Sequence, residues 1–338
     1  MSRNFQAVVF GAPNEIELRR FELPACGPKE IAVKTLYSMV SSGTEGRVLA
    51  GHYGAEGNFP LIPGYSVVGE VTEVGDEAKG WEVGDLVSAG NPQPVAGIHH
   101  QWGGHASHHL YDAEKPVLLP RGAAPLDYVV AELGAISFRG VMAASPKRGE
   151  TAAVIGQGLI GAFSAAWLGV LGCRVVVADV APSRLERALK RGVADAVNAR
   201  DENAAQRLAS LCGGADLVVE SSGNARGFAL ATSLLREDWS NGAKTNPPRL
   251  VLQANYIEEI PLNPCGFFRG EAVQVFAPVD RRRADRLAVV EHLRRGDLRA
   301  ADFVGEIVSP NDAPAAYARL RDAPDECFSV VFDWTNAD

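Results

Sequence analysis

The chain has 338 residues, of which 46% are hydrophobic and 22% charged, an ordinary composition for a soluble globular protein of two domains. Its net charge of −8 argues against nucleic acid or an anionic membrane as a partner, because both attract a basic surface. Five scattered cysteines and the absence of a signal-peptide pattern at Met1 indicate reduced thiols in a cytoplasmic protein.

The first 120 residues are typical of β-structure. Short runs rich in β-branched residues are separated by glycine and proline turns. These runs predict strands at Gln6–Phe10, Glu15–Leu18, Glu30–Ser38, Ser66–Val74 and Asp85–Ala89.

From about Tyr128 the pattern changes to strands that alternate with helices, after a helix predicted at Ala131–Ala144. The predicted strands are Thr151–Ile155, Arg174–Ala178, Ala194–Asn198, Leu217–Glu220 and Arg249–Ala254. The helices between them are Gly161–Leu171, Ser183–Arg191, Ala204–Cys212 and Phe228–Leu235. This alternation predicts an α/β domain with a doubly wound parallel sheet.

The last part of the chain predicts a strand at Ala272–Phe276, helices at Arg282–Arg295 and Asp312–Arg321, and a strand at Ser329–Trp334. We therefore expect a dinucleotide-binding domain at 132–272, inserted into a β-rich substrate domain made of 1–131 and 273–338.

A G-x-G-x-x-G turn follows the apolar strand directly and opens a helix, which is the context that pyrophosphate binding needs. The first glycine allows a tight turn, the second allows the backbone to approach the phosphates, and the third allows the helix to pack on the strand. The residues are Gly156, Gln157, Gly158, Leu159, Ile160 and Gly161.

Asp179 ends the second strand of this domain, 18 residues after Gly161. A carboxylate there accepts hydrogen bonds from ribose hydroxyls and repels a 2′-phosphate, which favours NAD over NADP as the cofactor. Further cofactor candidates are Arg184 and the strand-end segments Ser221-Ser222-Gly223 and Asn255-Tyr256, although plain turns would have the same composition.

The sequence resembles the medium-chain dehydrogenase/reductase family of alcohol and polyol dehydrogenases over essentially its whole length. The matching segments are Phe59–Gly64, Val67–Val71, Gly84–Val87, the glycine turn and Asp312–Tyr317. The resemblance implies a GroES-like catalytic domain, a Rossmann domain, hydride transfer with a small alcohol or ketone, and a homodimer or homotetramer.

Within this family the chain is similar to the branch that contains bacteriochlorophyllide a dehydrogenase, which oxidises a hydroxyethyl group on a tetrapyrrole. The similar segments are Ser42–Glu45, Pro63–Tyr65, Asn255–Tyr256, Phe267–Glu271 and Val330–Trp334. Because a fold does not fix a substrate, a cyclitol, a sugar or another secondary alcohol stays open.

The resemblance also shows what is missing. Zinc members carry a cysteine, a histidine and a glutamate where this chain has Ser42, Tyr65 and Ser66, and hydroxyls are poor zinc ligands. Glu132 aligns with a third ligand, but one carboxylate does not make a catalytic zinc site. Residues 88–115 contain none of the cysteines of a structural zinc lobe. We expect no bound metal.

Without zinc, side chains must move the hydroxyl proton and stabilise the alkoxide. Thr44 matches the family's proton-relay hydroxyl, and Tyr65 replaces a zinc ligand. Ser42 completes the hydrogen-bonding candidates, with Glu132 as the terminal base. The alternative is that Ser42, Tyr65 and Ser66 only fill the space that the metal has left.

Five histidines lie between positions 99 and 109: His99, His100, His105, His108 and His109. Strand alternation places His105 and His108 on opposite faces, which disfavours a shared metal site and leaves a role in the substrate cleft open.

These features predict a zinc-independent, NAD-dependent oxidoreductase that interconverts a secondary alcohol and a ketone. An alkene or quinone reductase is a second possibility, which Asp179 disfavours. A non-catalytic NAD-binding protein is the third.

Overall fold

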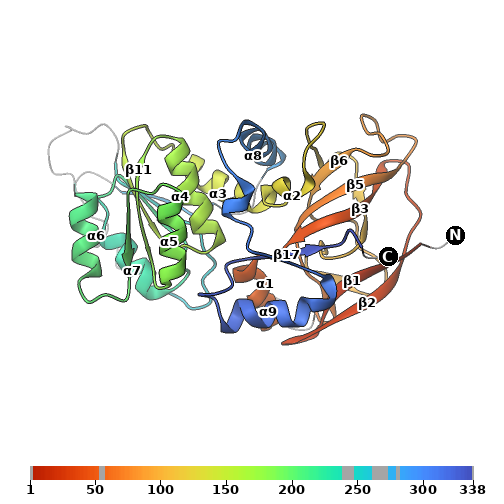
Figure 1. Ribbon diagram of the computed structural model, residues 1–338, viewed down its shortest axis with the longest axis horizontal. Helices are drawn as coiled ribbons and strands as arrows, with labels where there is room; N and C mark the ends of the chain where they lie inside the picture. The colour runs from red at the N-terminus through yellow and green to blue at the C-terminus, as the bar shows by residue number, and fades with distance from the viewer. Residues whose placement is uncertain (1–2, 53–57, 238–246, 261–272, 279–281, 337–338) are drawn as a thin grey trace. The chain divides into compact units, whose positions relative to one another are not determined.

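The computed structural model describes residues 3–52, 58–237, 247–260, 273–278 and 282–336. The chain divides into two compact units (Figure 1). The β-rich unit consists of residues 1–133 and 282–338, and the parallel-sheet unit consists of residues 134–281.

The β-rich unit contains two sheets. The first has the strand order β2-β1-β4-β7 and is formed by β1 (Arg3–Ala12), β2 (Glu15–Leu23), β4 (Leu61–Ile62) and β7 (His99–His100). The second has the order β16-β17-β3-β5-β6-β9, and β8 also pairs with β3. Its strands are β3 (Glu30–Met39), β5 (Ser66–Val74), β6 (Leu86–Ala89), β8 (His108–Asp112), β9 (Val117–Leu118), β16 (Glu306–Val308) and β17 (Val330–Asp333).

Strand β1 is buried on both faces. Val8 and Phe10 pack into one hydrophobic cluster with Trp334, whereas Ala7 and Val9 pack into a second cluster with Ile62. Alternate residues of a strand point to opposite faces, so β1 lies between two cores. The end of the chain joins the same architecture, because Phe332 of β17 pairs with Ser38 of β3.

The helices of the β-rich unit are α1 (Ser42–Leu49), α2 (Pro125–Tyr128), α8 (Arg283–Arg295) and α9 (Ala313–Asp322), with short turns η2 (Ala300–Asp302) and η3 (Pro310–Asp312). Helix α3 (Ala131–Ala143) begins in this unit and continues into the next. The sequence did not predict α1, because two glycines in eight residues give it a low helix propensity. Tertiary packing stabilises it, since Glu45, Val48 and Leu49 are buried and α1 contacts α9.

The parallel-sheet unit confirms the predicted doubly wound sheet. Its strand order is β12-β11-β10-β13-β14-β15, and neighbouring strands are parallel. The strands are β10 (Thr151–Ile155), β11 (Arg174–Asp179), β12 (Asp195–Asn198), β13 (Leu217–Glu220), β14 (Arg249–Leu252) and β15 (Gln274–Phe276). The predicted start of the last strand, Ala272, lies outside the described residues.

The helices of this unit are α4 (Leu159–Val170), α5 (Pro182–Lys190), α6 (Ala204–Cys212) and α7 (Ala225–Ser233). Figure 1 shows α4, α5 and α6 around β11, which all three contact. Strands β10 and β13 are neighbours although they are far apart in sequence. Their carboxyl ends, at Gly156 and Ser221, therefore lie side by side at the point where the strand order reverses.

Among the described residues, no helix is both long enough and apolar enough to cross a membrane.

Candidate functional site

The glycine turn follows β10 in the conformation that its residues were predicted to need. Gly156 has φ +89°, and a Cβ on Gly161 would lie 1.8 Å from the Gly156 carbonyl oxygen. Gly158 precedes the first residue of α4, no side chain caps the helix there, and nothing would lie within 4 Å of its Cβ. The first backbone N–H groups of α4, those of Leu159 and Ile160, thus lie at an uncapped helix N-terminus, which is the kind of site that binds anions.

Asp179 fastens the glycine turn to the end of β11. Its Oδ2 accepts the N–H of Gln157 at 2.5 Å, and its Oδ1 accepts the N–H of Ala181 at 2.8 Å. Arg184 Nη1 lies 3.9 Å from the same carboxylate. The structure therefore brings together three of the residues predicted to bind the cofactor.

Glu220, at the end of β13, holds the predicted turn Ser221-Ser222-Gly223. Its Oε1 accepts the N–H of Ser222 at 2.7 Å, and Tyr256, which follows β14, donates its phenol to Oε2. Burial, followed by the hydrogen bond and charge of Glu220, raises the pKa of Tyr256 above its ordinary value. Asn255, the neighbouring candidate, is exposed.

The residues at the carboxyl ends of these parallel strands fit a dinucleotide. Gln157 Oε1 and Ser221 Oγ are buried polar atoms without a hydrogen-bond partner, and they follow β10 and β13. A buried polar group without a partner is costly, so such atoms mark a place where a ligand supplies hydrogen bonds.

In the β-rich unit, Tyr65 is 5% exposed and donates its phenolic O–H to Ser41 Oγ at 2.5 Å. Its ring meets Trp102 edge to face at 5.0 Å between centroids. The sequence had pointed to Ser42 as part of this cluster, but the hydroxyl that Tyr65 contacts belongs to the residue before it. Ser42 and Thr44 are half-buried in the first turn of α1.

Ser41 is in turn held by Glu45, whose Oε1 accepts the Ser41 N–H at 2.8 Å. Glu45 is fully buried, and its Oε2 lies 2.9 Å from His105 Nε2 and accepts the phenol of Tyr317. Burial, followed by the charge of Glu45, raises the pKa of Tyr317 above its ordinary value.

The network continues from His105 to the end of the chain. His105 Nδ1 lies 2.8 Å from Ser38 Oγ, and Trp334 Nε1 donates to the same oxygen at 2.8 Å. A His105 tautomer with its proton on Nε2 satisfies every one of these groups. Sequence reasoning missed this network, because its partners come from β3, α1, α9 and the last residues of the chain. The Gly-Thr-Glu segment was its only signal.

Two further predicted positions have protein partners. Ser66 Oγ donates to the Val129 carbonyl at 2.7 Å. Glu132 is 1% exposed and forms an ion pair with Arg286 of α8, with 2.9 Å between Oε1 and Nη1. This buried ion pair joins the start of α3 to α8.

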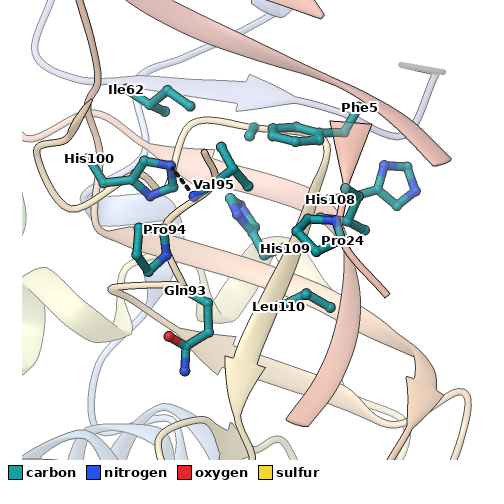
Figure 2. A pocket seen from close by; sticks show the side chains of 13 residues that line it. Phe5, Pro24, Ile62, Gln93, Pro94, Val95, His100, His108, His109 and Leu110 are labelled. Atoms are coloured by element: carbon teal, nitrogen blue, oxygen red, sulfur yellow. Dashed lines mark hydrogen bonds between the residues drawn. The ribbon is translucent and has the colours of Figure 1, made fainter. Parts of the chain in front are cut away.

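The histidine segment divides. His105 belongs to the buried network, whereas His100, His108 and His109 line a small cavity with Leu110 (Figure 2). The cavity has a volume of about 10 Å³, which is room for about one water molecule. Burial lowers the pKa of His109 to about 3 and that of His100 to about 4. Within the described ranges, no group of three or more His, Cys, Asp or Glu side chains is arranged to hold a metal.

Comparison with protein families gives two matches. An alcohol dehydrogenase GroES-like domain matches residues 27–121, and a zinc-binding dehydrogenase domain matches residues 160–238, so that the two cover half of the chain. The chain belongs to the zinc-type alcohol dehydrogenase family. The predicted fold class, a GroES-like domain with a Rossmann-like parallel sheet, is confirmed.

Members of this family and proteins of this fold match along the full chain. L-Threonine 3-dehydrogenase of Chelativorans sp. BNC1 is 26% identical over 99% of this chain and 100% of its own. An alcohol dehydrogenase of Escherichia coli CFT073, solved with NADH, has a TM-score of 0.84 at 20% identity and covers 98% of this chain and 100% of its own. A zinc-binding dehydrogenase of Sinorhizobium meliloti 1021, bound to NADP, has a TM-score of 0.83 at 19% identity over 98% and 99%.

Membership of the zinc-type alcohol dehydrogenase family makes the contacts at three of the ligand positions informative, two with a replaced residue and one with the retained Glu132. In this chain Tyr65 contacts Ser41, Ser66 contacts Val129, and Glu132 contacts Arg286. The motif Phe267–Glu271, which supported the closer branch resemblance, lies outside the described residues.

Proposed function

We propose that this protein interconverts a secondary alcohol and a ketone by hydride transfer with NAD(H), and that it does so without zinc. The observation that carries the proposal is that three of the four side chains at the family's ligand positions have protein partners: Tyr65 with Ser41, Ser66 with Val129, and Glu132 with Arg286. Neutral hydroxyls and a guanidinium-paired carboxylate are poor ligands for Zn²⁺.

A nicotinamide cofactor is supported by the open start of α4 and by the unpartnered polar atoms at the strand ends. The solved relatives include one with NADH and one with NADP. Asp179 supports NAD, because each of its oxygens has one backbone donor and retains a lone pair for a ribose hydroxyl. Its negative charge opposes a 2′-phosphate.

When bound, the cofactor supplies the hydride acceptor or donor at its nicotinamide ring. Tyr65 and Ser41 then transfer the proton that the substrate oxygen gains or loses. In the direction of reduction, the ketone carbon gains the hydride while its oxygen takes the phenolic proton of Tyr65. Ser41 returns a proton to the phenolate, and solvent restores Ser41. The reverse sequence oxidises the alcohol and releases one proton.

Thr44 and Ser42 lie in the first turn of α1, next to Ser41 in the chain. We propose that these hydroxyls orient the substrate oxygen and connect Ser41 to solvent. Glu132 has no step in this mechanism. We also propose a homodimer or homotetramer, as the family resemblance implies, which sedimentation equilibrium measures.

The test is a substrate and cofactor panel. The purified enzyme is assayed with NAD⁺ and NADP⁺ on 2,3-butanediol, sorbitol, threonine and a tetrapyrrole with a 1-hydroxyethyl group. Oxidation of at least one alcohol, faster with NAD⁺, supports the proposal. Reduction of alkenes or quinones with NADPH alone, or NADH binding without turnover of any compound, would replace it with one of the two alternatives.

A further inference from the structure

The turn after β13 and the segment after β14 are joined by a single carboxylate. Glu220 is fully buried. Its Oε1 accepts the N–H of Ser222 at 2.7 Å and also the Ser222 hydroxyl. The N–H of Gly223 lies 3.3 Å from both carboxylate oxygens, and the phenol of Tyr256 donates to Oε2.

All of these donors are neutral groups. A buried carboxylate is stable only when hydrogen bonds replace its hydration, and here backbone and hydroxyl donors do so. The side-chain oxygens of Glu220 therefore hold two loops that are distant in sequence, one through Ser222 and one through Tyr256.

Packing immobilises the same turn from its other sides. A Cβ on Gly227 of α7 would lie 1.8 Å from Ser222 Oγ and 3.0 Å from Glu220 Oε1. A Cβ on Gly156 would lie 2.8 Å from the Ser222 nitrogen. Asn224 caps α7 by accepting the N–H of Gly227 at 3.0 Å. The turn is therefore held between the glycine turn and the start of α7.

The position of Glu220 and its partners Ser222 and Tyr256 in the sheet indicates which part of a dinucleotide would bind next to them. Asp179 ends β11, on one side of β10, and is the residue proposed for the adenosine ribose. Strands β13 and β14 lie on the other side of β10, and a doubly wound sheet binds the second mononucleotide there. Ser221 Oγ, which is buried without a hydrogen-bond partner, follows β13 directly.

We propose that Glu220 is a positioning residue for the nicotinamide half of the cofactor. The inference rests on the proposed nicotinamide cofactor. Glu220 acts through Ser222 and Tyr256, and it holds the two strand-end segments in place so that Ser221 presents its hydroxyl to the nicotinamide nucleotide.

The test compares NADH with ADP, which has the same adenosine and phosphates but lacks the nicotinamide ring and its ribose. Both are titrated into the full-length protein by calorimetry. Glu220→Ala should weaken NADH binding about tenfold or more, because several donors lose their acceptor, and should change ADP binding less than about twofold. Glu220→Gln should recover most of the NADH affinity, since an amide can accept from Ser222 and donate to Tyr256. Glu186→Ala, an exposed glutamate on α5, is the control.

If Glu220→Ala folds poorly, Tyr256→Phe removes only the link to β14 and should still weaken NADH selectively. Equal weakening of NADH and ADP would show a general structural role and overturn the inference, as would unchanged NADH affinity in Glu220→Ala. Failure of the unaltered protein to bind NADH at all would instead remove the proposed cofactor, and the inference with it.

Discussion

The phenolic oxygen of Tyr65 lies 2.5 Å from the hydroxyl oxygen of Ser41, in the interior of the β-rich unit. Ser41 is fixed at its backbone by Glu45, at 2.8 Å. The orientation of the proposed proton donor therefore depends on a residue that the family's ligand pattern does not include.

Tyr65→Phe keeps the ring and removes the proton. We expect kcat for hydride transfer to fall by about 10²–10⁴-fold, the usual contribution of general acid–base catalysis, and Ser41→Ala to lower it by about tenfold. Stopped-flow detection of NADH measures both. Tyr37→Phe, a half-buried tyrosine of β3, is the matched control. A Tyr65→Phe enzyme with a normal chemical step would remove Tyr65 from the mechanism.

Tyr317→Phe deletes one donor to the fully buried Glu45. We expect the free energy of unfolding to fall by about 1–3 kcal/mol, because the carboxylate loses a hydrogen bond that water cannot replace. Urea denaturation followed by fluorescence gives the value. Identical midpoints for Tyr317→Phe and Tyr37→Phe would show that the network adds no stability.

Arg286→Met removes the guanidinium that pairs with the buried carboxylate of Glu132. The expected loss is about 3–5 kcal/mol of unfolding free energy. Adding Glu132→Gln to Arg286→Met should recover part of it, since the buried carboxylate that has lost its guanidinium disappears. This non-additivity is the signature of a direct pair. Strictly additive effects in the double variant would contradict the pairing.

His109 makes stability depend on pH. Burial lowers its pKa in the folded state to about 3, from about 6.5 in an unfolded chain, so the unfolded state binds the proton more tightly. Stability is therefore complete above pH 6.5 or so and declines as the pH falls towards 3, by up to about 1.4 kcal/mol per pH unit for one histidine. His109→Gln should flatten this slope in urea titrations between pH 4 and 6. A slope equal to that of the unaltered protein would assign the effect to other groups.

Asp179→Ala removes the charge that opposes a 2′-phosphate. We expect the ratio of kcat/KM for NAD⁺ to that for NADP⁺ to fall about tenfold or more, with Arg184 left to attract the phosphate. Asp195→Ala is the control, because Asp195 is the first residue of β12 and lies at the amino ends of the strands, whereas Asp179 lies at a carboxyl end. An unchanged ratio would mean that Asp179 serves only to hold the glycine turn.

Local signals were enough to predict most of the fold. Periodicity placed β10, α6 and β13 at their observed bounds, and the glycine spacing placed the start of α4 within two residues. Helix α1 was not predicted, because Gly43 and Gly46 lower its helix propensity. Its stability comes from packing against α9.

The site was less predictable, because its partners lie far apart in sequence. Arg286 reaches Glu132 from 154 positions away, and Tyr317 reaches Glu45 across 272. No local pattern encodes such pairs. Ser42 was chosen because it aligns with a metal ligand of the family. In the structure, the phenol of Tyr65 contacts the hydroxyl of Ser41 instead. The strand-end residues Asp179 and Ser221 could be predicted from the sequence, because the carboxyl ends of parallel strands lie at one edge of a sheet.

The central claim is that hydride transfer proceeds without zinc. Its most direct test follows deuterium from the carbinol carbon of a labelled secondary alcohol to NAD⁺, in a single turnover by enzyme dialysed against a chelator and measured for metal. We expect deuterium on the nicotinamide ring at an undiminished rate in protein that contains far less than one zinc ion per chain. Loss of transfer on chelation, restored by added Zn²⁺, would contradict the account.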